Sequence, residues 1–473
     1  MSNGTIVVRG GNDAATVGSA LLGRTFRIED AGMPLGLVWW RGLPWRWKDG
    51  KWVGIKRSEF LDELWLTLGN VMIETGEGDD VRRKKWGVTA SKVSDVARWI
   101  EARVAKRGDA APVDLRGEVR WPVGKTITFR DVVLNCVTGE TMARGAGWFD
   151  PCTRPVDWGD GEVRCPEWMG CMERWSKGDP EWVECMRRVM GYALMGWRGL
   201  QKLVLMYGVP RAGKSLTMGV LRRLLSDDLV VARSLDQMAG THGMMGTEGA
   251  RIISVGEVTK IKGQVQSQAC GLIKSIVGED PIAINPKNLA IEQVRSNALM
   301  MLLSNEIPEF PESSSSLTCK MVVLPFEVSF VGKEDDDLGE RLGAEVEGIA
   351  RWAARGAMRI FSEKEPSLRL VSPGSSKQVM EIMKEMGNPL QAWILRMFEP
   401  AANNWVNNET IRRLWERSGP KVRGTYSGNL LGAVMESIPK EWAVWTKSSN
   451  GHRRVQGMQL RAGVREEVLS DHG

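Results

Sequence analysis

Four short apolar runs recur along the middle of the chain, at 203–207, 252–255, 299–303 and 321–326. Continuous apolar runs of this length are typical of strands that are buried on both faces of a sheet. An amphipathic stretch, residues 216–225, follows the first run and has the spacing of a helix packed on that sheet. Alternating strands and helices predict an α/β domain built on a parallel sheet.

The flanking sequence has other patterns. Residues 1–30 suggest only a short leader or an irregular edge, 37–52 suggest a hairpin, and 58–68 and 91–104 have helical spacing. Residues 166–195 predict two helices, and the SPGSS segment at 372–376 predicts a linker. Three further helices and a hairpin are expected after it. The expected parts are a mainly helical, Trp-rich N-terminal domain at 1–165, a helical collar at 166–198, the α/β domain at 199–365 and a C-terminal domain at 380–473.

Composition narrows the possible classes of protein. The 473 residues are 42% hydrophobic and 26% charged, which is ordinary for a globular protein. No run approaches the ~20 apolar residues of a membrane helix, and the N-terminus lacks a signal-peptide pattern. We therefore expect a cytoplasmic protein without a membrane partner, in the host cell cytoplasm if a virus or mobile element encodes it. The net charge of +6 is compatible with nucleic acid but does not establish it.

Cysteine, histidine and tryptophan each bear on the chemistry. The seven cysteines form no C-x-x-C pair and suggest reduced, buried thiols, although a zinc site remains an alternative. Three histidines argue against His-metal nucleases and Ser-His-Asp catalysis. Tryptophan occurs 21 times, often beside basic residues, as in 39–52. Packing in a core is favoured over stacking of bases. The zinc alternative would use Cys152, Cys165, Cys171 and Cys185.

The most specific motif is GVPRAGKS at 208–215, which follows an apolar strand and precedes an amphipathic helix. Glycines let backbone N–H groups surround phosphate oxygens, and the helix N-terminus adds positive charge. Lys214 is expected to reach the β- and γ-phosphates, and the Ser215 hydroxyl to bind Mg²⁺. The motif therefore predicts ATP and Mg²⁺ as ligands. The expected nucleotide-binding residues are Gly208, Val209, Pro210, Arg211, Ala212, Gly213, Lys214, Ser215 and Leu216.

Polar residues follow two later strands of the predicted sheet. Glu257 comes just after the second apolar run, and Asn305 follows the third. The carboxyl ends of parallel strands form the ligand edge of such a sheet. We expect Glu257 to hold Mg²⁺ through water and to orient the attacking water, and Asn305 to contact that water or the γ-phosphate.

Taken in order, GVPRAGKS, IISVGE, LIKSIVGEDPIAINPK, MLLSNEIPEF and MVVLPF resemble the motifs of superfamily 3 helicases. The resemblance is to the phage- and plasmid-type primase-associated members, relatives of the poxvirus helicase-primase, and it covers roughly residues 36–365. It implies an AAA+-like P-loop NTPase core that assembles into a ring, usually a hexamer, and moves along single-stranded DNA. The family generally moves 3′ to 5′.

The resemblance also assigns residues outside the nucleotide loop. By match, Lys287 lies on a β-hairpin in the ring channel, and Lys274 lies in the earlier half of the same motif, both as DNA contacts. The family usually carries an arginine before the fourth apolar run, where it reaches the ATP of the neighbouring subunit. This chain has Lys320 there, and lysine lacks the planar fork of arginine. Either Lys320 serves, or another residue such as Arg341 does, or hydrolysis is slow.

The ends of the chain complete the functional hypothesis. No primase pattern is present, so a primase that works with this protein is expected to be a separate chain. The C-terminal helices and hairpin predict a winged-helix-like domain, in which Lys421, Arg423, Arg453 and Arg454 contact the phosphates of duplex DNA. The leading hypothesis is an ATP-dependent replicative DNA helicase of a phage, plasmid or other mobile element. The alternatives are an origin-binding or loading module without processive unwinding, and a ring motor acting on RNA or protein.

Overall fold

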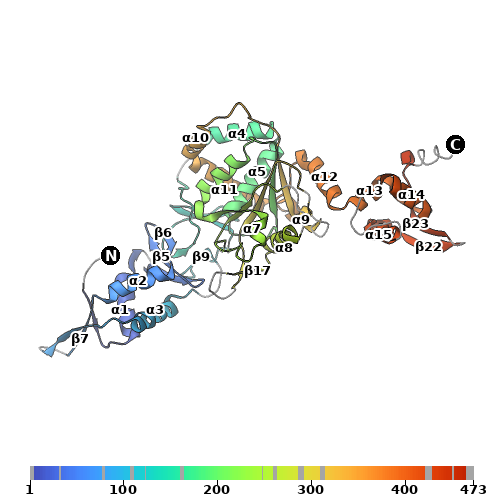
Figure 1. The fold of residues 1–473 in the computed structure, drawn as a ribbon. Helices are drawn as coiled ribbons and strands as arrows, with labels where there is room; N and C mark the ends of the chain where they lie inside the picture. Colours follow the sequence, from blue (N-terminus) through green and yellow to red (C-terminus); the bar gives the residue numbers. More distant parts are fainter. Residues whose placement is uncertain are drawn as a thin grey trace.

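The computed structural model describes residues 5–30, 33–76, 80–106, 111–122, 124–159, 164–247, 249–258, 264–285, 292–308, 310, 315–420, 429–449 and 452–464. Three parts follow one another in space: an N-terminal region, a central α/β body and a C-terminal lobe (Figure 1). Among the described residues, no helix is long and apolar enough to cross a membrane.

The central body contains a five-stranded sheet in the order β15-β16-β19-β14-β20, with every neighbouring pair parallel. Side chains on both faces are buried, because helices cover both sides. Four of these strands coincide with the predicted apolar runs. The edge strand β15 was not predicted, since it is short and only partly buried. The strands are β14 (Leu203–Gly208), β15 (Val230–Arg233), β16 (Ile252–Val255), β19 (Leu299–Ser304) and β20 (Met321–Phe326).

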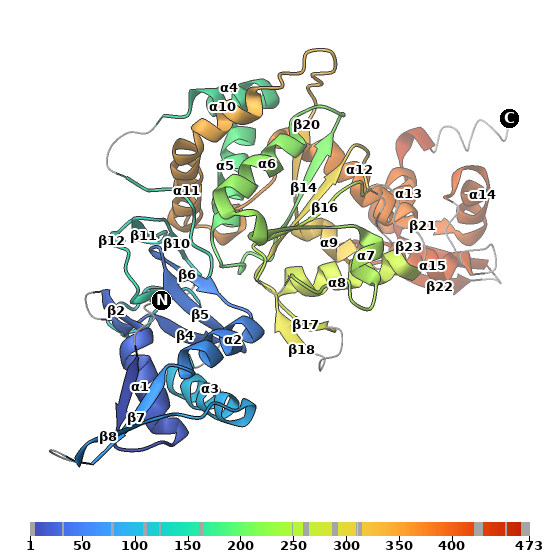
Figure 2. The same cartoon turned by 60° about the vertical axis from the view of Figure 1, so that its left-hand side comes forward.

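Alternate strand residues point into two separate cores. Val204 and Met206 pack with one group of helices, whereas Leu203 and Leu205 pack with the other. Figure 2 shows α5, α6 and α11 on one side of the sheet and α7, α8 and α9 on the other. The first group is α4 (Pro166–Ser176), α5 (Pro180–Leu194), α6 (Lys214–Leu225), α10 (Leu338–Ala344) and α11 (Val346–Ser362). The second group is α7 (Leu235–Ala239), α8 (Gln264–Gly278) and α9 (Ser315–Lys320).

Helices α5 and α11 cross at unusually short range. A Cβ on Gly191 of α5 would lie 2.2 Å from the backbone nitrogen of Ala357, and one on Gly356 of α11 would lie 2.1 Å from the carbonyl oxygen of Arg187. Glycine is therefore required at both positions for this close approach. The crossing fixes the predicted collar helix α5 against the helix that ends the α/β body.

The N-terminal region is not mainly helical, which corrects the expectation from sequence. Its described residues form the helices α1 (Ala14–Thr25), α2 (Arg57–Leu68) and α3 (Ala90–Val104) among many short strands. Most of these strands are too short to carry a recognisable periodicity. The strands are β1 (Ile6–Arg9), β2 (Arg27–Asp30), β3 (Met33–Leu35), β4 (Leu37–Trp40), β5 (Leu43–Lys48), β6 (Lys51–Gly54), β7 (Val71–Thr75), β8 (Arg82–Lys85), β9 (Val113–Asp114), β10 (Thr126–Thr128), β11 (Val132–Asn135), β12 (Thr141–Ala143) and β13 (Trp148–Phe149).

Residues 5–30 form a strand, a helix and a second strand, where the sequence suggested a short leader or an irregular edge. Strand β1 pairs in parallel with β7, and α1 buries Val17 and Leu21 in the core of this region. The carboxylate of Asp13 accepts hydrogen bonds from the backbone nitrogens of Ala15 and Thr16, which caps α1. The early segment is therefore part of the folded core.

The tryptophans of the 37–52 hairpin pack inside the protein, as the core interpretation expects, whereas Trp65 of α2 is exposed. Trp39, Trp40 and Trp52 are buried. The rings of Trp40, Trp45 and Trp52 each meet the ring of Phe149 edge-on, at centroid distances of 5.4 to 5.7 Å. Farther along, Ile127 and Phe129 join the same core cluster as Trp168 of α4, so packing continues across the expected boundary at residue 165.

The C-terminal lobe has its own core and a three-stranded antiparallel sheet in the order β21-β23-β22. The predicted helices and hairpin are present, and β21 is an additional strand. Between the body and the lobe, the expected linker is docked: the Ser372 hydroxyl accepts a hydrogen bond from the nitrogen of Val323, and Ser376 is buried. The elements that follow this segment are α12 (Lys377–Gly387), α13 (Pro389–Met397), β21 (Phe398–Asn407), α14 (Asn408–Ser418), α15 (Leu430–Ser437), β22 (Trp445–Ser449) and β23 (His452–Leu460).

Candidate functional site

The loop between β14 and α6 depends on two glycines. Gly208 has φ +145°, and a Cβ there would lie 1.9 Å from the carbonyl oxygen of Phe326. Gly213 has φ +100°, and a Cβ there would lie 2.5 Å from the indole of Trp175. Both the backbone conformation and the space exclude larger residues. The turn that brings the chain from the strand tip to the helix N-terminus is therefore specific to glycine.

Lys214 is the first residue of α6, and its side chain folds back over the loop. Its Nζ donates hydrogen bonds to the carbonyl oxygens of Gly208, at 2.6 Å, and Val209, at 2.8 Å. The residue is only 8% exposed, and this burial lowers the pKa of the ammonium group. A bound anion would favour the charged form of this group. The adjacent Ser215 is exposed, at a helix N-terminus whose first N–H groups have no partner inside the helix.

The last residue of β20 and the segment after it form hydrogen bonds with the loop. The backbone nitrogen of Val209 donates to the Phe326 carbonyl at 3.1 Å, and the Ser329 hydroxyl donates to the Pro210 carbonyl at 3.1 Å. The nitrogen of Phe330 donates to the Arg211 carbonyl at 3.2 Å. These three contacts hold the loop open as a preformed shape. The sequence did not indicate this bracing, because no local pattern links 326–330 to the loop.

Glu257 and Asn305 lie at the same edge of the sheet as this loop. The registers pair Tyr207 with Ser304 and Val255 with Leu302, so the ends of β14, β16 and β19 are level. Both predicted residues come just after those ends, and both are exposed. The Ser304 hydroxyl donates to the Val258 carbonyl at 2.6 Å and ties the two strand tips together.

Lys320 lies at the opposite edge of the sheet. It immediately precedes β20, whose first residue Met321 is level with Leu203 at the start of β14. Its Nζ donates to the Oε1 atom of Gln201 at 2.9 Å. Lys320 is therefore remote from the loop of its own chain, as a residue acting on a neighbouring subunit would be.

Arg341 of α10 is held within its own chain. Its guanidinium donates to both carboxylate oxygens of Asp335, at 3.1 and 2.6 Å, and also contacts Glu167. The hydrogen bond to Asp335 raises the pKa of this arginine and lowers the pKa of the aspartate. These contacts occupy the planar fork that an arginine acting in the neighbouring site would need.

The predicted channel motif forms a hairpin of β17 (Pro281–Ile284) and β18 (Glu292–Arg295). Lys287 lies outside the described residues, as do Lys421 and Arg423. Lys274 is half-buried on α8 rather than on the hairpin. The ring of His242 contacts the Asn285 carbonyl through Nδ1, at 2.7 Å, beside the end of β17.

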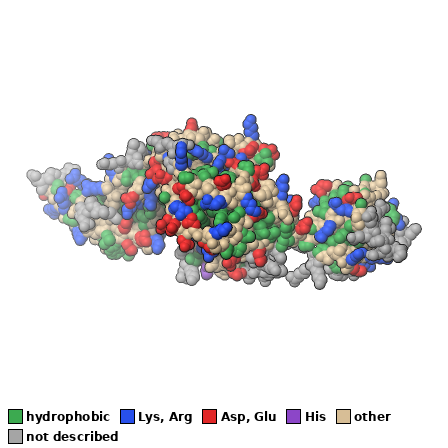
Figure 3. All heavy atoms as spheres, turned by 90° about the horizontal axis from the view of Figure 1, so that it is seen from above, with side chains coloured by type: hydrophobic (Ala, Val, Ile, Leu, Met, Phe, Trp, Pro, Cys, Tyr) green, Lys and Arg blue, Asp and Glu red, His purple; other side chains and the backbone are tan. Residues whose placement is uncertain are grey.

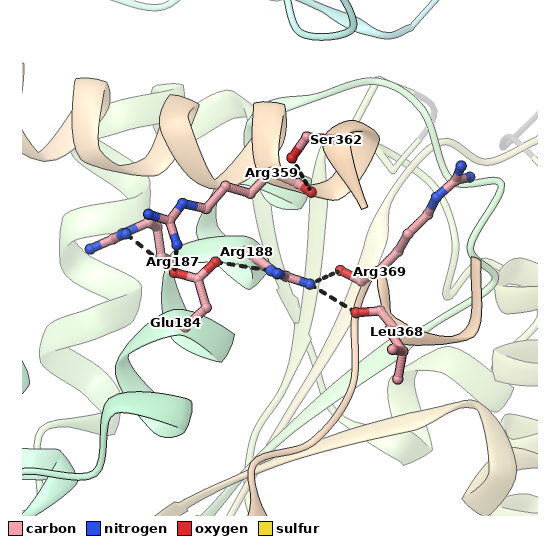
Figure 4. A network of polar contacts seen from close by, with 7 residues as sticks. All are labelled: Glu184, Arg187, Arg188, Arg359, Ser362, Leu368 and Arg369. Carbon is pink, nitrogen blue, oxygen red and sulfur yellow. Dashed lines mark hydrogen bonds and ion pairs between the residues drawn. The ribbon is translucent and has the colours of Figure 1, made fainter. Parts of the chain in front are cut away.

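A cavity of about 440 Å³ lies away from the loop, between the β11–β12 turn and helices α5 and α11. Beside it, Glu184 accepts hydrogen bonds from Arg187, Arg188 and Arg359 (Figure 4). Arg188 also donates to the carbonyl oxygens of Leu368 and Arg369. This network joins α5 to α11 and to the segment after it.

The four cysteines of the zinc alternative are buried in the core, and burial raises the pKa of each thiol. Across the described residues, no three His, Cys, Asp or Glu side chains gather in a group able to hold a metal. The zinc alternative therefore has no support from this structure.

Comparison with known proteins gives a fold and a partial family match. The profile of a family of unknown function (DUF5906) matches residues 206–317, which is less than half of the chain. No curated protein matches. The apo A form of the NrS-1 C-terminal region aligns with a TM-score of 0.51 at 10% identity, over 88% of this chain and 94% of that one. A second apo structure of that region aligns with a TM-score of 0.46 at 10% identity, over 86% and 100%. The chain shares a fold with the first of these structures.

Proposed function

We propose that the chain is an ATP-dependent replicative DNA helicase of a phage, plasmid or other mobile element, acting as a ring on single-stranded DNA. The observation that supports the proposal is the glycine-dependent loop, in which Lys214 is bonded to the Gly208 carbonyl, at the sheet edge where Glu257 and Asn305 follow β16 and β19. Parallel sheets bind nucleotides in the crevice at the carboxyl ends of their strands. The fold shared with the NrS-1 C-terminal region supports a place among phage replication proteins.

Each residue of the edge has a distinct proposed task. Backbone N–H groups of the loop and the start of α6 bind the phosphates of ATP, and Lys214 leaves its two loop carbonyls to contact them. Ser215 and Glu257 hold Mg²⁺, which neutralises the phosphate charge. Glu257 orients the attacking water, and Asn305 senses the γ-phosphate. Lys320 acts on the ATP of the neighbouring subunit.

Two further elements support action on DNA. The β17–β18 hairpin protrudes from the sheet body (Figure 2) and would carry Lys287 toward a strand in the ring channel. After α12, the described elements α13, β21, α14, α15, β22 and β23 follow the order expected of a winged helix, which supports a contact with duplex DNA.

The test measures ATP hydrolysis and strand displacement on forked DNA with Mg²⁺. We expect Lys214→Ala to lose nucleotide binding. We expect Glu257→Gln to bind ATP but to hydrolyse it at least about 100-fold more slowly than the wild type. Glu416→Gln, an exposed change on α14, is the matched control and should hydrolyse normally. Lys287→Ala should keep basal hydrolysis but lose displacement. Hydrolysis that survives both changes at the loop edge would refute the assignment.

A second candidate is an origin-binding or loading module without processive unwinding. It is favoured by one observation: Lys320 replaces the arginine of the family and is engaged by Gln201. Lysine offers charge without bidentate geometry, so hydrolysis across subunits would be slow. Lys320→Arg separates the two candidates. Faster hydrolysis together with strand displacement would favour the helicase, whereas hydrolysis without displacement by any variant would favour the loader.

A further inference from the structure

The outer face of the C-terminal sheet carries two exposed tryptophans in register. Trp405 of β21 and Trp445 of β22 both pair with Gln456 of the central strand β23. Residues directly opposite one another in an antiparallel sheet point to the same face. The two indoles therefore flank Gln456 on one face, with exposed fractions of 44% and 51%. With ordinary strand spacing they stand about 10 Å apart, so each has room for a different planar ligand.

These two tryptophans do not belong to the core of the lobe. Val406, next to Trp405, and Val455, next to Gln456, point the other way and are buried in that core. Trp393 is buried in that core, and Trp415 and Trp442 pack against it. Burial of a tryptophan side chain is a large gain in free energy. The lobe buries Trp393 fully and Trp415 and Trp442 partly, so the two exposed indoles are a surface feature outside its core.

Basic groups occupy the next row of the same face. Arg454 lies two residues before Gln456 and pairs with Asn407 and Lys447. Its guanidinium carbon lies 3.8 Å from the ring centroid of Trp405, close enough for a cation–π contact that holds the ring in place. The two rows contain two cations and no acid. Elsewhere, on the side of the molecule seen in Figure 3, basic and acidic side chains are interspersed.

We propose that this face, defined by Trp405, Trp445, Gln456, Arg454, Lys447 and Asn407, binds single-stranded DNA by stacking bases on the two indoles. Rigid aromatic faces beside cations are the chemistry that single strands recognise, because every base has a π-face and every nucleotide a phosphate. Duplex DNA hides its base faces, so the sheet selects single strands. The inference rests on the proposed function only in taking DNA, rather than RNA, as the strand that is bound. It does not depend on ATP hydrolysis.

The test measures binding of a fluorescent oligothymidylate and of an abasic strand of the same length, without nucleotide, by the full chain carrying Lys287→Ala. This background removes the proposed channel contact. We expect Trp405→Ala with Trp445→Ala to weaken oligothymidylate binding about 10-fold or more and to leave abasic binding unchanged. Trp→Phe at both positions should restore part of the affinity. Lys447→Gln should instead reduce the salt dependence of binding.

Trp65→Ala is the matched control, because Trp65 on α2 is also 44% exposed. It should bind as the Lys287→Ala background does. An unchanged unfolding temperature of the double alanine variant would exclude misfolding. If the double alanine variant is misfolded, the double phenylalanine variant is used to measure oligothymidylate binding instead. Equal binding of abasic and thymidine strands by the background, or no loss in the alanine variant, would overturn the proposal. Failure of ATP hydrolysis would refute the proposed function alone.

Discussion

Tryptophan beside arginine occurs at both ends of the chain, with opposite outcomes. In the N-terminal region Arg41 stacks over Trp40, at 4.6 Å from its centroid, yet Trp40 is buried. In the C-terminal lobe Arg454 stacks over Trp405, which remains exposed. The two tryptophans differ in burial because different numbers of layers pack against their sheets. The N-terminal hairpin is covered by Phe149 from a later strand, whereas the described helices of the C-terminal lobe cover its sheet on one face only. The same local pair is structural where a second layer exists and available to a ligand where none does.

The largest expected change in stability comes from removing a buried indole in the N-terminal region. Trp52→Ala removes a ring that contacts Phe149 and donates from its Nε1 atom to the Trp148 carbonyl at 3.1 Å. We expect the free energy of unfolding of the N-terminal region to fall by about 3–5 kcal/mol, measured by calorimetry. Trp52→Phe should cost less. A loss below 1 kcal/mol would mean that this cluster is not a core.

The second effect concerns the exposed indoles. Trp405→Ala should change the free energy of unfolding of the C-terminal lobe by less than about 1 kcal/mol, because its ring lies outside the core. Single-strand affinity should nevertheless fall. Calorimetry on the same preparation measures the stability, and the oligothymidylate assay measures the affinity. If this variant is as unstable as Trp52→Ala, the two regions do not differ in the way described.

The smallest effect depends on pH and concerns β7, the central strand of the β1-β7-β8 sheet. The side chain of Glu74 lies between Arg83 and Arg9, and the hydrogen bond from Arg83 is the main reason why the pKa of this carboxylate is lowered. A carboxylate whose pKa is lower in the folded state than in the unfolded state stabilises the fold at pH values above its unfolded-state pKa. This contribution disappears as the pH falls through the folded-state pKa. Glu74→Gln should therefore lose stability at pH 7 but little at pH 3. Urea unfolding at both pH values checks this, and an equal loss at both would contradict the ionic explanation.

Much of the central body was predictable because its pattern is local. The four apolar runs form strands, and the glycines, lysine and serine of the loop occupy consecutive positions. Strand β21 was missed because its FEPAANNWVN sequence has low strand propensity and its pairing shifts between Ala401 and Trp405. The docking of 372–376 was missed because SPGSS is typical of a linker, and only the partner atoms on β20 and α5 hold it.

The sequence by itself determined the glycine-dependent loop, four of the five strands of the central sheet, and the candidate residues that follow two of those strands. These features depend on neighbouring positions, so periodicity and backbone freedom specify them. Only the tertiary structure decided how the strand ends are aligned, where Lys320 lies, which tryptophans are buried and which stay exposed. Parallel register brings Glu257 and Asn305 level with the loop and leaves Lys320 at the far edge. Burial depends on whether a second layer covers a face, and that layer comes from distant parts of the chain.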